Sequence, residues 1–94
     1  MYQAENGTLD GQVFYGVIVE DSASGKRICY QVSGEYRFWI IWNDKGFNGY
    51  FCPEPMSAMI DAPNLDLPRA LTGYRELAPQ ASETFHQHFR LITA

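Results

Sequence analysis

The sequence predicts an all-β fold built from about six or seven short antiparallel strands. Runs rich in valine, isoleucine and aromatic residues alternate with segments rich in glycine, asparagine, aspartate and serine, which is typical of strands joined by turns. Apolar residues make up 46% of the 94 residues and aromatic residues 15%, which argues against disorder and predicts a packed core. We therefore expect one all-β domain, or a fragment of one, over residues 1–94.

The first three predicted strands include a hairpin and an apolar strand that follows it. Strands are expected over 13–21 and 27–33, with a hairpin loop at 22–26. The run Phe38–Trp42 is apolar on both faces, as expected of a strand buried between layers at the centre of the core. The turn residues at 43–46 come directly after it.

The remaining elements are predicted with less regular structure. A strand starts at 49–52 and ends at Pro53-Glu54-Pro55, because prolines cannot donate to a sheet ladder. Between 56 and 73 we expect no strand, only a short helical turn at 56–60 that Pro63 stops. The last elements are predicted as a strand at 74–77, a turn at 78–82 and a terminal strand at 83–92, with Phe85, Phe89 and Leu91 on one face.

Charge and hydropathy exclude several classes of partner. The net charge is −4 and the seven basic residues are scattered singly, so there is no patch for nucleic acid or for an anionic membrane surface. No apolar run approaches the roughly 18 to 20 residues that span a bilayer, and residues 1–6 lack the features of a signal peptide. We therefore expect a cytoplasmic protein. Cys29 and Cys52 lie in apolar β-like runs and are expected to be buried free thiols.

Glu54 is the first candidate for chemistry. Two flanking prolines hold it in an extended conformation, so its side chain leaves a stiff backbone in one direction. Strand alternation places Tyr50, Cys52 and Glu54 on the same side, at a partly apolar rim. Apolar surroundings favour the neutral form of a carboxyl group, which suits acid/base chemistry near neutral pH. The alternative interpretation is a solvated or capping residue at the end of a strand.

Histidines and aromatic residues offer further candidates. His86 and His88 form an H-x-H pair on one face of the predicted terminal strand, a spacing that can chelate a metal ion. No carboxylate or cysteine lies at a spacing that would add a further ligand, so an exposed polar face is favoured. No metal or cofactor is predicted. Five aromatic residues could form a platform on which the C–H face of a sugar ring stacks: Trp39, Trp42, Tyr36, Tyr50 and Tyr74. For the two tryptophans core packing is favoured over ligand contact, and for the tyrosines the two interpretations stay open.

The segment from Cys52 to Asn64 carries a recognisable pattern. Its sequence is C-P-E-P-M-S-A-M-I-D-A-P-N, with Glu54-Pro55, a hydroxyl residue at Ser57, and 61–64 as Asp-Ala-Pro-Asn. An apolar tryptophan-containing strand precedes it, and Leu-Ala-Pro at 77–79 and a last strand opening with Glu-Thr-Phe at 83–85 follow it. From about residue 13 onward, this order resembles the aldose 1-epimerases, which include the galactose mutarotases and their relatives.

The resemblance implies a specific fold and chemistry. The implied fold is an antiparallel β-sandwich, the C-terminal portion of a galactose mutarotase-like supersandwich. The implied activity is that of an isomerase, which interconverts sugar anomers by opening and closing the ring. Glu54 is then the candidate general base, with Tyr50, Ser57 and Asn64 as candidate substrate-binding residues. The family's general acid is a histidine that precedes this region, and none is found there, since both histidines of this chain follow Glu54. Met56 and Ser57 also stand where an aromatic residue and a threonine are usual.

Two expectations follow from the absence of the acid and of the earlier strands. The chain alone is predicted to have little or no activity, because a proton transfer that lacks one partner loses on the order of 10² to 10⁴ in rate. The open apolar faces and strand edges predict a homo-oligomer or a missing N-terminal fragment. A non-catalytic all-β module that binds carbohydrate or protein remains the alternative.

Overall fold

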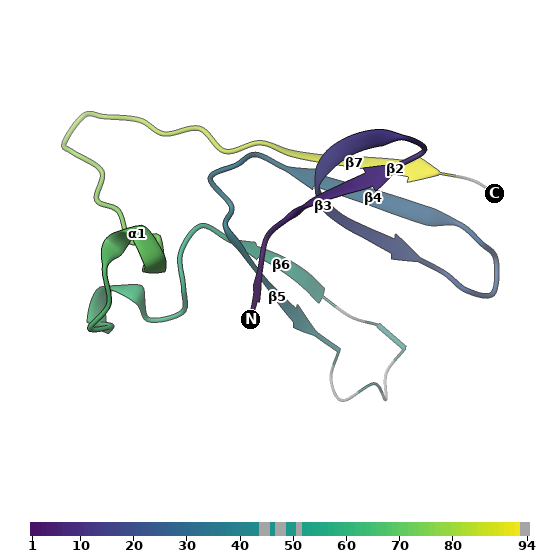
Figure 1. Cartoon of the computed structure of the whole chain (residues 1–94), viewed down its shortest axis with the longest axis horizontal. Coiled ribbons are helices and arrows are strands. Elements are labelled where there is room, and N and C mark those ends of the chain that lie inside the picture. Colours follow the sequence, from purple (N-terminus) through teal and green to yellow (C-terminus); the bar gives the residue numbers. More distant parts are fainter. Residues whose placement is uncertain (44–45, 47–48, 51, 93–94) are drawn as a thin grey trace. The chain divides into compact units, whose positions relative to one another are not determined.

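The strands form two antiparallel sheets in two compact units (Figure 1). The computed structural model describes residues 1–43, 46, 49–50 and 52–92. The first unit comprises Met1–Gln3 and Glu35–Thr84, and the second comprises Ala4–Gly34 and Phe85–Ala94. Every strand pair among the described residues is antiparallel, and helix there is limited to short turns, which confirms the predicted all-β class.

The sheet of the second unit has the strand order β2-β3-β4-β7. Its strands are β2 (Asn6–Leu9), β3 (Gln12–Glu20), β4 (Arg27–Val32) and β7 (Gln87–Ile92). The predicted hairpin is confirmed as β3 and β4, which pair from Gly16 with Gln31 to Glu20 with Arg27. The short strand β2 was not predicted, because a four-residue run containing asparagine, glycine and threonine has little β signal.

Asp21 organises the hairpin loop between β3 and β4. Its backbone N–H donates to the Lys26 carbonyl (2.9 Å), and its own carbonyl accepts from the Gly25 N–H (2.8 Å). Its carboxylate accepts from the Ser24 hydroxyl (2.7 Å) and from the Ala23 N–H (3.1 Å). These bonds stabilise the charged form, so they hold the pKa of Asp21 below its usual value of 3.8. The loop is thus closed by its first residue.

The core of the second unit lies along β4. Cys29 is fully buried as a free thiol, as expected, and Tyr30 and Val32 are buried beside it. The Tyr30 ring stacks on Phe89 of β7 at 4.1 Å, and its hydroxyl donates to the Gln87 side chain (2.5 Å). Since these contacts join β4 to β7, they also fix the register of the terminal strand.

The terminal strand is shorter than predicted. It begins at Gln87 rather than at residue 83, although the His86 carbonyl still accepts from the Ser33 N–H (2.9 Å). Glu83 is instead tied to Arg75 by an ion pair of 2.5 Å within the first unit. Phe89 and Leu91 share a face as predicted, while Phe85 precedes the strand.

The sheet of the first unit has the order β1-β5-β6. Its strands are β1 (Tyr2–Gln3), β5 (Phe38–Trp42) and β6 (Cys52–Met56). The bounds predicted for β5 are confirmed, but its burial is not uniform. Phe38 and Trp39 are buried, whereas Ile41 and Trp42 are 44% and 50% exposed. The prediction of a strand buried along its whole length is therefore wrong for its second half in this chain.

The segment after β6 contains two helical turns, η2 (Ala62–Asn64) and α1 (Arg69–Thr72). The helical turn expected at 56–60 is wrong, because Met56 ends β6 and Pro63 lies inside η2. Proline fits the first turn of a helix, where its missing N–H has no partner to lose. The strand expected at 74–77 is also wrong, since this segment has no ladder partner among the described residues.

The predicted turns are only partly testable. The turn at 78–82 is confirmed by the Ala81 N–H, which donates to the Ala78 carbonyl (3.1 Å). At 43–46 the Gly46 N–H donates to the Asn43 carbonyl (2.8 Å), and residues 44–45 lie outside the described part. The strand expected to start at 49 is described only from Cys52, and residue 51 is outside the described part too.

We predict that Gly16→Ala strongly destabilises the hairpin. A Cβ on Gly16 would lie 1.9 Å from the Tyr30 carbonyl oxygen, so the paired backbones would have to separate. The free energy of unfolding, measured by urea denaturation, should fall by about 3 kcal/mol or more. Gly34→Ala is the control, because a Cβ there meets nothing within 4 Å, and it should change stability by less than about 0.5 kcal/mol. Equal effects of the two variants would contradict the close approach.

We also predict a stability contribution from Asp21 that depends on pH. The pKa of Asp21 is lower in the folded chain than in the unfolded one, so its contribution is present above the unfolded pKa and is lost as the pH falls through the folded pKa. Ser24→Ala removes the largest cause of the shift, and should raise the Asp21 pKa measured by NMR titration. Ser22→Ala is the control and should leave it unchanged. An identical titration in all three proteins would refute the assignment.

Candidate active site

Pro53, Glu54 and Pro55 lie inside strand β6, not beyond its end. The predicted end of the strand at this segment is therefore wrong, because the ladder continues to Met56. Neither proline has an N–H, so only Cys52, Glu54 and Met56 can donate from this strand. Among the described residues β6 is an edge strand that pairs with β5 alone, so the missing donors fall on its open side. The prolines thus block one edge and leave the other edge intact.

The pairing register places Glu54 in apolar surroundings. Glu54 lies directly opposite Ile40, with Trp42 opposite Cys52 and Phe38 opposite Met56. Paired residues of an antiparallel ladder share a face, and diagonal neighbours lie within reach of large side chains. Glu54 is exposed, whereas Ile40 and Cys52 are half-buried. One carboxylate therefore stands on a sheet face whose neighbouring side chains are all apolar or aromatic.

Tyr50 and Trp42 flank this face at the loop end of the strands. Their ring centroids are 5.7 Å apart and the rings are tilted by 58°. Tyr50 is 44% exposed and precedes β6, so the tilt of its ring toward Trp42, rather than strand alternation, connects it to the face of Glu54. For Trp42 the favoured interpretation, packing in the core, is wrong within this chain, and the alternative of ligand contact stays open. The pairing of Trp42 with Cys52 places Trp42 on the face of Glu54, and this pairing could not be predicted from the sequence alone.

Ser57 and Asn64 follow the carboxylate in a turn that is locally closed. Ser57 is half-buried directly after β6, and Asn64 is exposed at the end of η2. The Asn64 side-chain amide donates to the Asp61 carboxylate (2.7 Å), and the Asn64 N–H donates to the Asp61 carbonyl (3.0 Å). The Asp-Ala-Pro-Asn pattern thus has a structural role, because Asp61 and Asn64 close the turn between them.

Helix α1 is bonded both to the segment after β6 and to the residue before β5. Thr72 is 1% exposed, and its carbonyl accepts from the Met59 N–H (2.8 Å). The Arg37 guanidinium donates to the Ala70 carbonyl (2.7 Å). Gly73 follows with φ +78° and approaches Ser57 so closely that a Cβ would lie 2.7 Å from the Ser57 carbonyl oxygen. The backbone around Ser57 is therefore positioned by packing as well as by chain direction.

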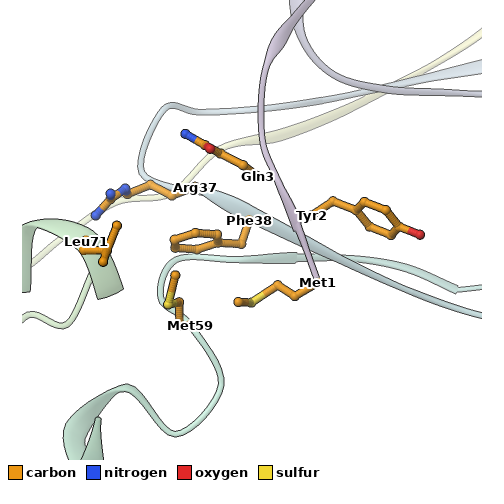
Figure 2. Close-up of a pocket in the computed structure, with 7 residues that line it drawn as sticks. All are labelled: Met1, Tyr2, Gln3, Arg37, Phe38, Met59 and Leu71. Carbon is orange, nitrogen blue, oxygen red and sulfur yellow. The ribbon is translucent and has the colours of Figure 1, made fainter. Parts of the chain in front are cut away.

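A pocket of about 250 Å³ opens at the opposite end of β5 from Trp42. Figure 2 shows the Phe38 ring at its centre, with Met59 and Leu71 on one side and Met1 on the other. The lining residues are Met1, Tyr2, Gln3, Arg37, Phe38, Met59 and Leu71. Glu54 does not line it, and it holds no carboxylate or histidine, so its chemistry is that of an apolar cavity with a guanidinium at the rim.

Tyr74, one of the candidate sugar contacts, is engaged within the chain. Its hydroxyl donates to the Glu76 carboxylate (3.0 Å), and the Arg69 guanidinium lies 4.7 Å from the centre of its ring. The hydrogen bond to Glu76, reinforced by the charge of that carboxylate, raises the pKa of Tyr74 above its usual value of 10.0. These contacts favour a structural role for Tyr74.

The two histidines and Glu54 belong to different units of the chain. His86 and His88 are exposed residues of the second unit, and Glu54 is a residue of the first. His86 precedes β7, and its backbone N–H donates to the Ser33 hydroxyl (3.0 Å). Among the residues that the structure describes, no three histidine, cysteine, aspartate or glutamate side chains are grouped to hold a metal ion. In the same part of the chain, no helix is long and apolar enough to cross a membrane.

Comparison with solved structures finds a protein of similar fold and related sequence. The chain matches the crystal structure of a galactose mutarotase-like protein from Clostridium acetobutylicum, with a TM-score of 0.88 and 30% sequence identity. The match covers 98% of this chain and 27% of that protein, so this chain spans about a quarter of its length. No protein-family model matches the sequence.

The predicted family resemblance is thereby confirmed. Over nearly its whole length the chain is similar to one part of a galactose mutarotase-like protein, and it has the antiparallel β fold of that part. The match is consistent with a C-terminal part, as the order of motifs in the sequence predicts.

We predict that Gly73→Ala disturbs the turn next to Ser57. Gly73 and Gly11 both have a left-handed φ, near +80°, but a Cβ on Gly11 meets nothing within 4 Å. Gly11→Ala should therefore cost only the backbone strain, about 1 kcal/mol, whereas Gly73→Ala should cost about 1 to 3 kcal/mol more. Denaturant unfolding measures the difference, and amide exchange should locate it at Met59, whose N–H bonds to Thr72. Equal losses in the two variants would contradict the packing of Gly73 against Ser57.

Proposed function

We propose that this chain is part of an aldose 1-epimerase-like isomerase in which Glu54 is the general base. The observation that supports the proposal most directly is the place of Glu54, a single carboxylate on an apolar and aromatic sheet face, held by a strand that two prolines stiffen. The similarity to a galactose mutarotase-like protein makes a sugar the expected substrate. The chain spans about a quarter of that protein, so isomerase activity is proposed for a longer protein that contains this chain.

In the proposed reaction Glu54 accepts the proton of the anomeric hydroxyl. The electrons of that O–H bond form the carbonyl while the bond from the anomeric carbon to the ring oxygen breaks, and a general acid protonates the ring oxygen. The open-chain aldehyde rotates about its bond to the next carbon, and reversal of the proton transfers closes the ring as the other anomer. Glu54 thus ends the cycle deprotonated, ready for the next sugar.

The general acid is assigned to a part of the protein outside this chain. The resemblance implies a histidine that precedes Glu54 in sequence, whereas His86 and His88 follow it. The chain by itself is therefore proposed to be nearly inactive, since the loss of one proton-transfer partner costs on the order of 10² to 10⁴ in rate. A longer protein would also supply further sugar contacts, which would improve the positioning of the substrate.

The candidate substrate contacts are proposed with different roles. Tyr50 offers an exposed ring and a hydroxyl beside the face of Glu54. Ser57 lies three residues beyond Glu54 in a turn that packing holds in place, so its backbone and hydroxyl can orient a bound sugar. Asn64 donates one amide hydrogen to Asp61, which leaves its carbonyl oxygen available as an acceptor.

The partners are proposed to be a monosaccharide and a second polypeptide surface, either a further part of the same protein or another copy of it. Ile28 and Leu91 face each other across the β4–β7 ladder, and Phe89 lies two residues before Leu91 on the same face. These side chains are 41%, 65% and 62% exposed. An apolar stripe of this kind supports a covering partner. The proposal also includes a cytoplasmic location, and it includes neither a cofactor nor a nucleic-acid partner.

A non-catalytic carbohydrate-binding module is the second candidate. The exposed pair of Trp42 and Tyr50 favours it, because such a pair can bind a sugar whether or not Glu54 performs chemistry. Retained sugar binding in a protein without any anomer interconversion would distinguish this candidate from the isomerase.

We predict that Glu54→Gln abolishes anomer interconversion in the longer protein that the proposal implies. Glutamine keeps the size of the side chain and its extended backbone but cannot accept the proton, so kcat should fall by about 10²- to 10⁴-fold. Polarimetry of freshly dissolved D-galactose measures the rate, and thermal unfolding should shift little because Glu54 is exposed. Glu20→Gln, at an exposed strand end, is the matched control. Full activity of Glu54→Gln would remove Glu54 as the base.

A further inference from the structure

We propose that Trp42, steadied by Tyr50, is the platform on which the sugar ring stacks beside Glu54. This inference rests on the proposed function and deepens it, because it names a positioning residue for the same site and restricts the substrate to a ring with an open C–H face. It concerns Trp42 as a residue that orients the substrate, not as a catalytic residue.

The register of β5 with β6 places the indole beside the carboxylate. Trp42 pairs with Cys52, and Glu54 is two residues further along β6 on the same face. Diagonal neighbours of this kind lie about 7 to 8 Å apart at their Cα atoms, which is within reach of an aromatic side chain. A sugar ring that lies on the indole therefore has one edge directed toward the Glu54 carboxylate.

The two tryptophans of β5 differ in exposure. Trp39, on the other face of the same strand, is 3% exposed, whereas Trp42 is 50% exposed. A large ring left half in water at the loop end of an apolar face gains little for the stability of the fold, so a ligand surface explains it better than a core contact.

Tyr50 fixes the orientation of the indole without covering it. The two rings meet at 5.7 Å with a tilt of 58°, which is a tilted contact rather than a stack of parallel faces. Tilted aromatic pairs have a preferred geometry, so Tyr50 restricts the rotation of the Trp42 side chain. Both rings remain open to solvent, since Tyr50 is itself 44% exposed.

The chemistry of a pyranose matches this arrangement. A hexose has an apolar face of C–H groups and a rim of hydroxyls, and an aromatic ring binds the C–H face while the hydroxyls remain free to bond. If the C–H face lies on Trp42, the anomeric hydroxyl at the rim can be directed to Glu54. Orientation of this kind contributes to rate because it replaces a search among geometries with one reactive arrangement.

The test uses D-galactose and D-glucose as probes with the full-length protein that carries this chain. In ¹H–¹⁵N NMR spectra the indole signal of Trp42, assigned through Trp42→Phe, should shift saturably on titration, while the signal of buried Trp39 stays in place. In kinetics, Trp42→Ala should raise KM about tenfold or more with a smaller change in kcat, and Trp42→Phe should restore most of the affinity.

Two controls separate this inference from the assignment of the base. Tyr2→Ala removes an aromatic ring that is 64% exposed on the opposite face, where Tyr2 pairs with Trp39, and it should leave KM unchanged. Glu54→Gln should abolish turnover but keep the indole shift. If Glu54→Gln stayed active while the shift persisted, the assignment of Glu54 as the base would fail and the platform would stand. An unmoved Trp42 signal together with an unchanged KM in a folded Trp42→Ala variant would overturn the platform.

Discussion

The site depends on the two hydrogen-bond donors that β6 lacks. Because Pro53 and Pro55 have no N–H, the strand can pair with β5 only through the alternate residues, Glu54 among them. A slip of one residue would turn the prolines toward β5 and move Glu54 to the other face of the sheet. The prolines therefore exclude a slip of one residue and so determine the face that carries the carboxylate and the closed outer edge of the sheet.

The neighbours of Glu54 follow from that register. Ile40 lies opposite it and Trp42 lies diagonally from it, so a chain segment well before the carboxylate supplies its surroundings. The turn that follows is held independently, by the Asp61–Asn64 pair and by the approach of Gly73 to Ser57. The strand and the turn thus reach the same site through separate sets of interactions, which keeps Glu54 and Ser57 in a defined relation.

The parts of the fold that were predictable are those with strong local patterns. The hairpin of β3 and β4 has β-branched strands and a loop that Asp21 closes, and β5 is a continuous apolar run with turn residues after it. The parts that were missed have weak local signals. β1 is two residues long and depends on pairing with the distant strand β5, and β2 is a four-residue strand that pairs with its neighbour β3. α1 is a four-residue turn held by tertiary contacts such as the bond from Arg37.

By itself, the sequence determined the all-β class, the stiff extended backbone at Glu54 and the family resemblance, because each of these depends on local residue chemistry and spacing. Only the tertiary structure decided that the strand continues through the prolines, that Asn64 bonds to Asp61 and that Trp42 lies half exposed beside the carboxylate. The physical reason is that periodicity shows which residues share a face, whereas exposure and neighbours depend on the strand that pairs with that face and on what covers it.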